Sequence, residues 1–120
     1  MKSDGFDAVI ESANRLVNFI DEISKGLVKV EQALRNNFTN VPFSKGPLTF
    51  KQDERIKHRC YRLFIVSGDI ERPMLETPLD IRVGYVKYVP DFMNSYAKFL
   101  EERIEALEAL YSGEEKNGRI

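Results

Sequence analysis

An apolar repeat over the first 34 residues constrains this chain more than any other feature. Apolar side chains recur at steps of three and four residues through about four heptads. The members of this seam are Phe6, Val9, Ala13, Leu16, Ile20, Ile23, Leu27, Val30 and Leu34. Because such steps return to the same face of an α-helix, the repeat predicts one long amphipathic helix over residues 1–38.

The local sequence agrees with this helix. Ser3 or Asp4 can cap its start, and Asn36 with Asn37 can end it in a left-handed conformation. Acids also precede bases by four residues, which is the stabilising order on a helix. These pairs are Glu11 with Arg15, Asp21 with Lys25, and Glu31 with Arg35. The seam is widened by Ile10, Val17 and Phe38 on one side and by Phe19 and Ala33 on the other. A wide stripe favours a bundle-like contact over a two-stranded zipper.

The length of this helix predicts self-association. A helix of about 32 residues is roughly 48 Å long, whereas a compact domain with the length of the whole chain has a diameter of about 35 Å. Part of the seam therefore needs another chain, most simply a second copy packed antiparallel, so we expect a homodimer or higher homo-oligomer. The residues predicted to make this contact are Phe6, Val9, Leu16, Ile20, Ile23, Leu27, Val30 and Leu34.

Residues 39–76 have the character of a small antiparallel sheet. NVPFSKGP is typical of a connecting loop, and LTF after it can begin a strand. The alternation from Ile56 to Val66 predicts a central strand, with SGD as a turn before a return strand from Ile70 to Leu75. We expect a meander of two or three strands.

Residues 77–112 are expected to be helical. Thr77-Pro78-Leu79-Asp80 has the composition of a helix start with threonine as the cap, although the alternation in residues 79–89 also fits a strand. A last helix is predicted from Asp91 to Tyr111, followed by a frayed tail at 113–120. The fold class is therefore α+β in a single domain of 120 residues.

Charge and composition exclude several functional classes. A net charge of -1 gives no general attraction to nucleic acid or to an anionic membrane, so such binding would need a local patch. The acidic N-terminus does not resemble a signal peptide, and no run of about 18 apolar residues occurs. We expect a cytoplasmic protein that does not bind membranes. Its one cysteine cannot form an internal disulfide.

His58 and Cys60 are the only histidine and cysteine of the chain. On a strand they would share a face, but a tight metal site needs two more ligands, and a nucleophilic cysteine needs a base within hydrogen-bond distance. A packed, structural cysteine explains the pattern more simply. We therefore predict no catalytic residue, no metal and no cofactor.

A basic strip between residues 51 and 62 is the alternative functional site. Its candidate nucleic-acid contacts are Arg55, Lys57, Arg59, Tyr61 and Arg62. Cations can hold phosphates and tyrosine can stack on a base. The acids Asp69, Glu71 and Glu76 follow directly in the predicted meander, and cross-strand ion pairs would explain the strip without a ligand.

The sequence therefore favours a non-enzymatic, self-associating interaction or assembly module, which can also have a protein partner. The alternative is a nucleic-acid-binding regulator that uses the strip at 51–62.

Overall fold

The computed structural model describes residues 4–36, 41–56 and 60–118. The chain divides into two compact units, residues 1–89 and 90–120, and each is described by itself. A long helix, an antiparallel sheet and further helices make the fold α+β, as the sequence predicts.

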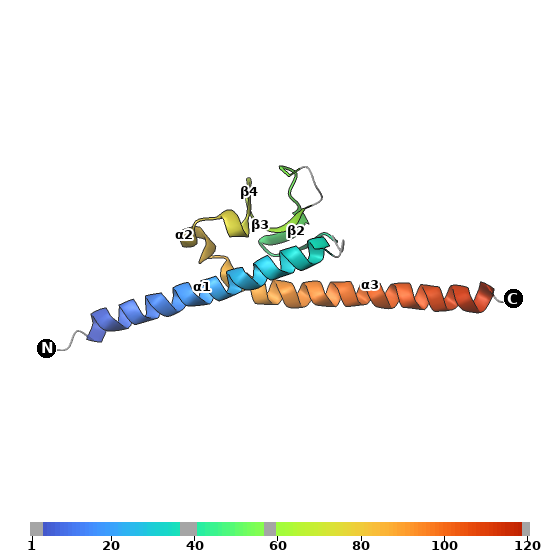
Figure 1. Ribbon diagram of the computed structural model, residues 1–120, viewed down its shortest axis with the longest axis horizontal. Coiled ribbons are helices and arrows are strands. Elements are labelled where there is room, and N and C mark those ends of the chain that lie inside the picture. The colour runs from blue at the N-terminus through green and yellow to red at the C-terminus, as the bar shows by residue number, and fades with distance from the viewer. Residues whose placement is uncertain (1–3, 37–40, 57–59, 119–120) are drawn as a thin grey trace. The chain divides into compact units, whose positions relative to one another are not determined.

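Helix α1 spans Asp4–Asn36 and confirms the predicted long helix. Its C-terminal half packs against the sheet, whereas its N-terminal half runs beyond the sheet (Figure 1). Ile20 and Leu27 are buried, with 1% and 2% of their surface exposed. The apolar seam of α1 is therefore covered only in part by its own unit.

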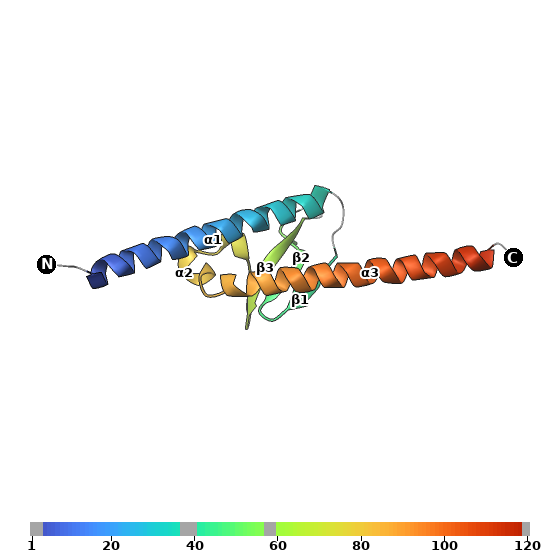
Figure 2. The same cartoon turned by 90° about the horizontal axis from the view of Figure 1, so that it is seen from below.

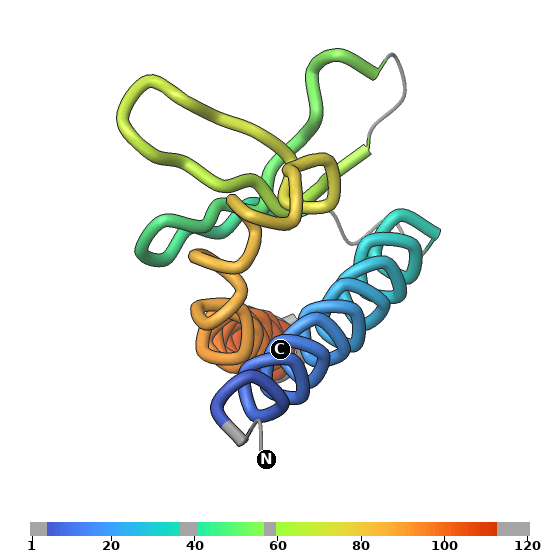
Figure 3. The backbone as a smooth tube through the Cα atoms, turned by 90° about the vertical axis from the view of Figure 1, so that its left-hand side faces the viewer, coloured from blue at the N-terminus to red at the C-terminus, as the bar shows by residue number. Residues whose placement is uncertain are grey.

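The sheet has four antiparallel strands in the order β1-β2-β3-β4. These are β1 (Phe43–Lys45), β2 (Leu48–Gln52), β3 (Tyr61–Ser67) and β4 (Ile70–Pro73). The prediction of two or three strands was too low because β1 lies in the segment expected to be a loop. Gly46 adopts φ 57°, a left-handed turn that lets the residues before it pair with β2. Gly68 makes the second hairpin at φ 61°. Figure 3 shows the β1–β2 and β3–β4 hairpins as teal and yellow-green loops.

The strand predicted from Ile56 to Val66 begins later than expected, and residues 57–59 of its predicted span lie outside the described residues. Ile56 lies in a bend, and the strand begins only at Tyr61. A turn at Asp53 causes the late start, because its carboxylate accepts the backbone N–H of Arg55 and its carbonyl accepts that of Ile56. Asp53 N then donates to Cys60 O over 2.8 Å, which closes the connection between β2 and β3.

The core of the sheet is formed by one face of β2 and β3. Leu48 lies opposite Ile65 and Phe50 opposite Leu63, and all four are buried. β-branched, aliphatic and aromatic side chains in alternation suit such a half-buried surface. α1 lies alongside this small sheet, as a second view shows (Figure 2).

Residues 74–88 contain three short helical elements. Residues 79–89, for which the sequence allowed either a helix or a strand, therefore form an interrupted helix. The elements are η1 (Met74–Glu76), α2 (Leu79–Arg82) and η2 (Val86–Tyr88). Thr77 does not cap α2 as predicted, because its hydroxyl donates to Met74 O over 2.6 Å. Arg82 instead fastens this segment, donating to Ser24 Oγ of α1 and to Thr77 O.

The described part of the second unit is helical throughout and belongs to α3, which spans Val89–Gly118 and so begins at the last residue of the first unit. Pro90 fits at its start, where a missing backbone N–H breaks no helical hydrogen bond. The helix continues beyond the predicted end at Tyr111, so the backbone of the tail expected to fray is helical to Gly118.

Candidate functional site

The N-terminal half of α1 carries a stripe of exposed apolar side chains. Their exposed fractions range from 38% to 75%, far above those of the core. The members are Phe6, Val9, Ile10, Leu16, Val17 and Phe19, which we call the N-terminal stripe. With each large side chain contributing on the order of 100 Å², the stripe exposes roughly 600 Å², the upper end for the largest apolar patch of a monomer. A patch of this size is typical of an interaction site.

The structure divides the predicted self-association residues into two groups. Phe6, Val9 and Leu16 belong to the exposed stripe, whereas Ile20 and Leu27 are buried. The remaining three, Ile23, Val30 and Leu34, are half-buried. Ile10, Val17 and Phe19 were not among the predicted contacts, although the widening of the seam at these positions was the signal that could have placed them there.

A charged cluster fastens the other half of α1 to the sheet. It consists of Glu31, Asp53, Arg55, Arg62 and Glu76. Arg62, on β3, lies at its centre and is largely buried, with 14% of its side chain exposed. Its guanidinium is 3.4 Å from Glu31 Oε1 and 3.5 Å from Asp53 Oδ2, and it also pairs with Glu76. Three carboxylates from separate parts of the chain therefore share one guanidinium.

Glu31 of α1 occupies the place that a neighbouring strand leaves empty. Val66 N donates to Pro47 O on the β2 side, so Leu63 N points to the opposite side. β4 ends at Pro73, opposite Phe64, and cannot reach Leu63. Glu31 Oε2 accepts this N–H over 3.0 Å. A buried helix carboxylate thus completes the hydrogen bonding of the sheet edge.

Environment shifts the pKa values of the acids in this cluster in opposite directions. Burial raises the pKa of Glu31, although the N–H of Leu63 and the Arg62 guanidinium partly oppose this. The Arg55 side chain, which donates to both oxygens of Asp53, lowers the pKa of that carboxyl to about 2. Hydrogen bonds from Arg55 and Arg62 lower the pKa of Glu76. At neutral pH, ion pairing therefore keeps Asp53 and Glu76 charged.

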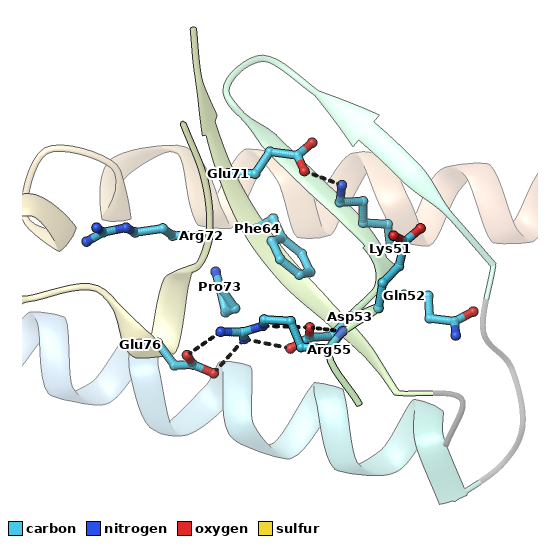
Figure 4. A pocket seen from close by; sticks show the side chains of 10 residues that line it. Lys51, Gln52, Asp53, Arg55, Phe64, Glu71, Arg72, Pro73 and Glu76 are labelled. Carbon is cyan, nitrogen blue, oxygen red and sulfur yellow. Dashed lines mark hydrogen bonds and ion pairs between the residues drawn. The ribbon is translucent and has the colours of Figure 1, made fainter. Parts of the chain in front are cut away.

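The described residues of the basic strip are engaged within the chain. Arg55 binds Asp53 and Glu76, and Lys51 of β2 is 2.6 Å from Glu71 of β4 (Figure 4). The Tyr61 ring packs 5.7 Å from that of Phe50. Lys57 and Arg59 lie outside the described residues. The ion pairing predicted between the basic strip and the acids that follow it is confirmed for Glu76, which binds Arg55 and Arg62. Glu71 also pairs with the strip, through Lys51.

A shallow pocket of about 300 Å³ lies beside this cluster on β2, β3 and β4. The Phe64 ring forms part of its wall, with the Lys51 ammonium 5.1 Å from the ring centroid. Arg72 borders the pocket, but its side chain points away from the other labelled residues (Figure 4). The cations that face the pocket already have carboxylate partners, which leaves the pocket without an obvious anion-binding group among the described residues.

Cys60 is a free thiol and is buried, with 4% of its surface exposed. It precedes β3 instead of lying within a strand, and His58 is outside the described residues. Among the residues that the structure does describe, no three His, Cys, Asp or Glu side chains gather as a metal site requires.

Comparisons of the chain with protein-family models, with curated proteins and with solved structures give no match. Among the described helices, none combines the length and apolar character needed to cross a membrane.

Proposed function

We propose that this protein is a non-enzymatic, self-associating assembly module, and that the N-terminal stripe of α1 forms the contact between copies. The observation that carries this proposal is the exposure of six large apolar side chains on one helix, among them Phe6 at 75% and Val9 at 68%. Two copies that cover their stripes would bury about 1,200 Å² together, the lower limit of a standard specific interface.

The spacing of the stripe favours an antiparallel pair that crosses at Ala13. Reflection about this residue places Val9 opposite Val17 and Ile10 opposite Leu16, so these four apolar side chains face one another. A small residue at the crossing point lets the two backbones approach closely.

Light scattering on the purified protein tests this association. At micromolar concentration we expect a mass near twice 13.9 kDa or a higher multiple. Leu16→Asp places a charge in the stripe and should yield a monomer, because a charge is costly to bury unpaired. Asn18→Asp is the matched control, since residue 18 lies on the opposite face of the same turns. A monomeric wild-type protein at this concentration would contradict the proposal.

Disulfide trapping tests the crossing point. The chain has one cysteine, so Cys60→Ala gives a cysteine-free background into which Ala13→Cys can be placed. Two residues on a two-fold axis face each other, and mild oxidation should therefore produce a covalent dimer rapidly. Ala33→Cys, exposed near the other end of α1, is the control and should cross-link much more slowly. Equal rates for the two variants would exclude a crossing at Ala13.

The alternative of nucleic-acid binding has less support, because Arg55 and Arg62 already bind carboxylates.

A further inference from the structure

The outer half of α3 carries a second exposed apolar stripe. Ile104, Leu107 and Tyr111 follow one another at helical spacing, and Leu110 lies beside them. Their exposed fractions are 49%, 64%, 69% and 62%, respectively. If each large side chain again contributes on the order of 100 Å², the four expose on the order of 400 Å² of surface. We call these four residues the α3 stripe.

The charge beside the α3 stripe is unbalanced. Residues 101–111 contain four acids, Glu101, Glu102, Glu105 and Glu108, against one base, Arg103. Glu101 and Glu105 are four residues apart, and Glu105 and Glu108 are three apart, so neighbouring side chains repel each other on the helix surface. Within the described part of the chain, the structure gives these four glutamates no ion pair. α1 differs, because three of its acids each precede a base by four residues.

The acids lie along one edge of the α3 stripe. At about 100° per residue, Glu101, Glu105 and Glu108 fall beside Ile104 and Tyr111. The opposite edge carries Arg103, whose guanidinium lies 5.8 Å from the centre of the Phe99 ring. The surface is therefore apolar in the middle and negative along one side.

We propose that the α3 stripe and its acidic edge bind a basic amphipathic helix of a different protein. Apolar side chains at helical spacing on the partner would cover the stripe, and lysine or arginine residues on one flank would relieve the repulsion among the glutamates. A second copy of α3 would bring a second surface of the same net negative charge. Helix α1 of a second copy is no better as a partner for the α3 stripe, because its N-terminal half begins with the acids Asp4, Asp7 and Glu11. The charge thus favours a basic partner over self-pairing.

A fluorescent synthetic peptide provides the probe. It consists of leucine and lysine arranged as an amphipathic helix, and its binding to the full-length protein is measured by fluorescence anisotropy at physiological salt. A peptide with the same leucine positions and glutamate in place of lysine is the first control. A scrambled leucine–lysine peptide without a continuous apolar face is the second.

Charge reversal on the protein separates the α3 surface from overall charge. The test variant carries Glu101→Lys, Glu105→Lys and Glu108→Lys, and the matched variant carries Asp4→Lys, Asp7→Lys and Glu11→Lys. We expect saturable binding of the leucine–lysine peptide to the wild type, weakened at least about tenfold by the α3 reversal and little changed by the α1 reversal. The α3 variant should instead bind the leucine–glutamate peptide. Leu107→Asp should weaken binding without changing the mass of the protein.

Three results would overturn the proposal. The first is no binding of the leucine–lysine peptide at about 100 µM, a concentration at which even weak specific complexes form. The second is an equal loss of binding in the two charge-reversal variants, which would show a response to net charge alone. The third is a lower mass of Leu107→Asp in light scattering, which would show that a second copy covers the α3 stripe.

Discussion

The two halves of α1 have the same apolar repeat but opposite surroundings. In the C-terminal half, Leu27 is buried and Glu31 is bound to the edge of β3. In the N-terminal half, Phe6 and Val9 are at least two-thirds exposed although they belong to the same seam. The repeat therefore defines a face of the helix without specifying what covers it. A sheet of four short strands reaches only part of a 33-residue helix.

The largest effect should come from a charge in the buried half. Leu27→Asp places a carboxylate where 2% of the side chain is exposed, and we expect it to destabilise the protein by more than about 3 kcal/mol. Val9→Asp changes the same seam in the exposed half and should cost less than about 1 kcal/mol in the dissociated chain. Chemical unfolding at low protein concentration measures both. Similar losses for the two variants would break the contrast between the halves.

Loss of the Glu31 carboxylate should have an intermediate effect. Glu31→Ala leaves Leu63 N without an acceptor and removes one partner of Arg62, so we expect a loss of about 1–3 kcal/mol. Glu31→Gln keeps an acceptor for the N–H and should recover part of this. Gln32→Ala, at the exposed next position, is the control and should stay within about 0.5 kcal/mol of the wild type.

The same substitution should change how stability depends on pH. Burial raises the folded-state pKa of Glu31 above its ordinary value of 4.5, so its contribution to stability is full below that value and is lost as pH rises through the folded-state pKa. Asp53, with its pKa lowered to about 2, acts in the opposite sense, and stability is lost as pH falls from about 4 toward 2. Unfolding curves measured from about pH 2 to neutral pH should show a loss of stability as pH rises above 4.5 in the wild type and not in Glu31→Gln. An unchanged profile would show that the charge of Glu31 is not coupled to folding.

The smallest effect should come from the exposed ion pair on the sheet. Lys51 and Glu71 are 2.6 Å apart but have side chains that are 34% and 50% exposed, so solvent screens their attraction. We expect Lys51→Ala to cost less than about 1 kcal/mol. A double-mutant cycle with Glu71→Ala isolates the pair from the contact between Lys51 and Phe64. A coupling energy between Lys51 and Glu71 as large as the loss from Glu31→Ala would contradict this prediction. It would show that the exposed pair stabilises the fold as much as the buried cluster does.

Local signals in the sequence were sufficient for the two long helices, α1 and α3. The seam from Phe6 to Leu34 predicted α1, because helical periodicity over many turns has no other regular solution. The periodic segment after Pro90 predicted α3 in the same way, although not its continuation to Gly118. The strands were less well predicted. β1 has three residues and depends on pairing with β2. A segment of three residues is too short to show the alternating pattern that predicts a strand.

The charged cluster shows what only tertiary structure decided. The sequence indicated that Glu31 pairs with Arg35 on the same helix, whereas the fold brings Glu31 to Arg62 and Leu63, more than 30 residues away along the chain. The fold likewise places Arg62 beside Asp53 and Glu76, which come from two other segments of the chain. Such contacts depend on which backbone groups a sheet edge leaves unpaired. Amphipathic periodicity is a property of residues close in sequence and can be read from them, but the partners that satisfy buried charges and sheet edges are set by the packing of distant segments.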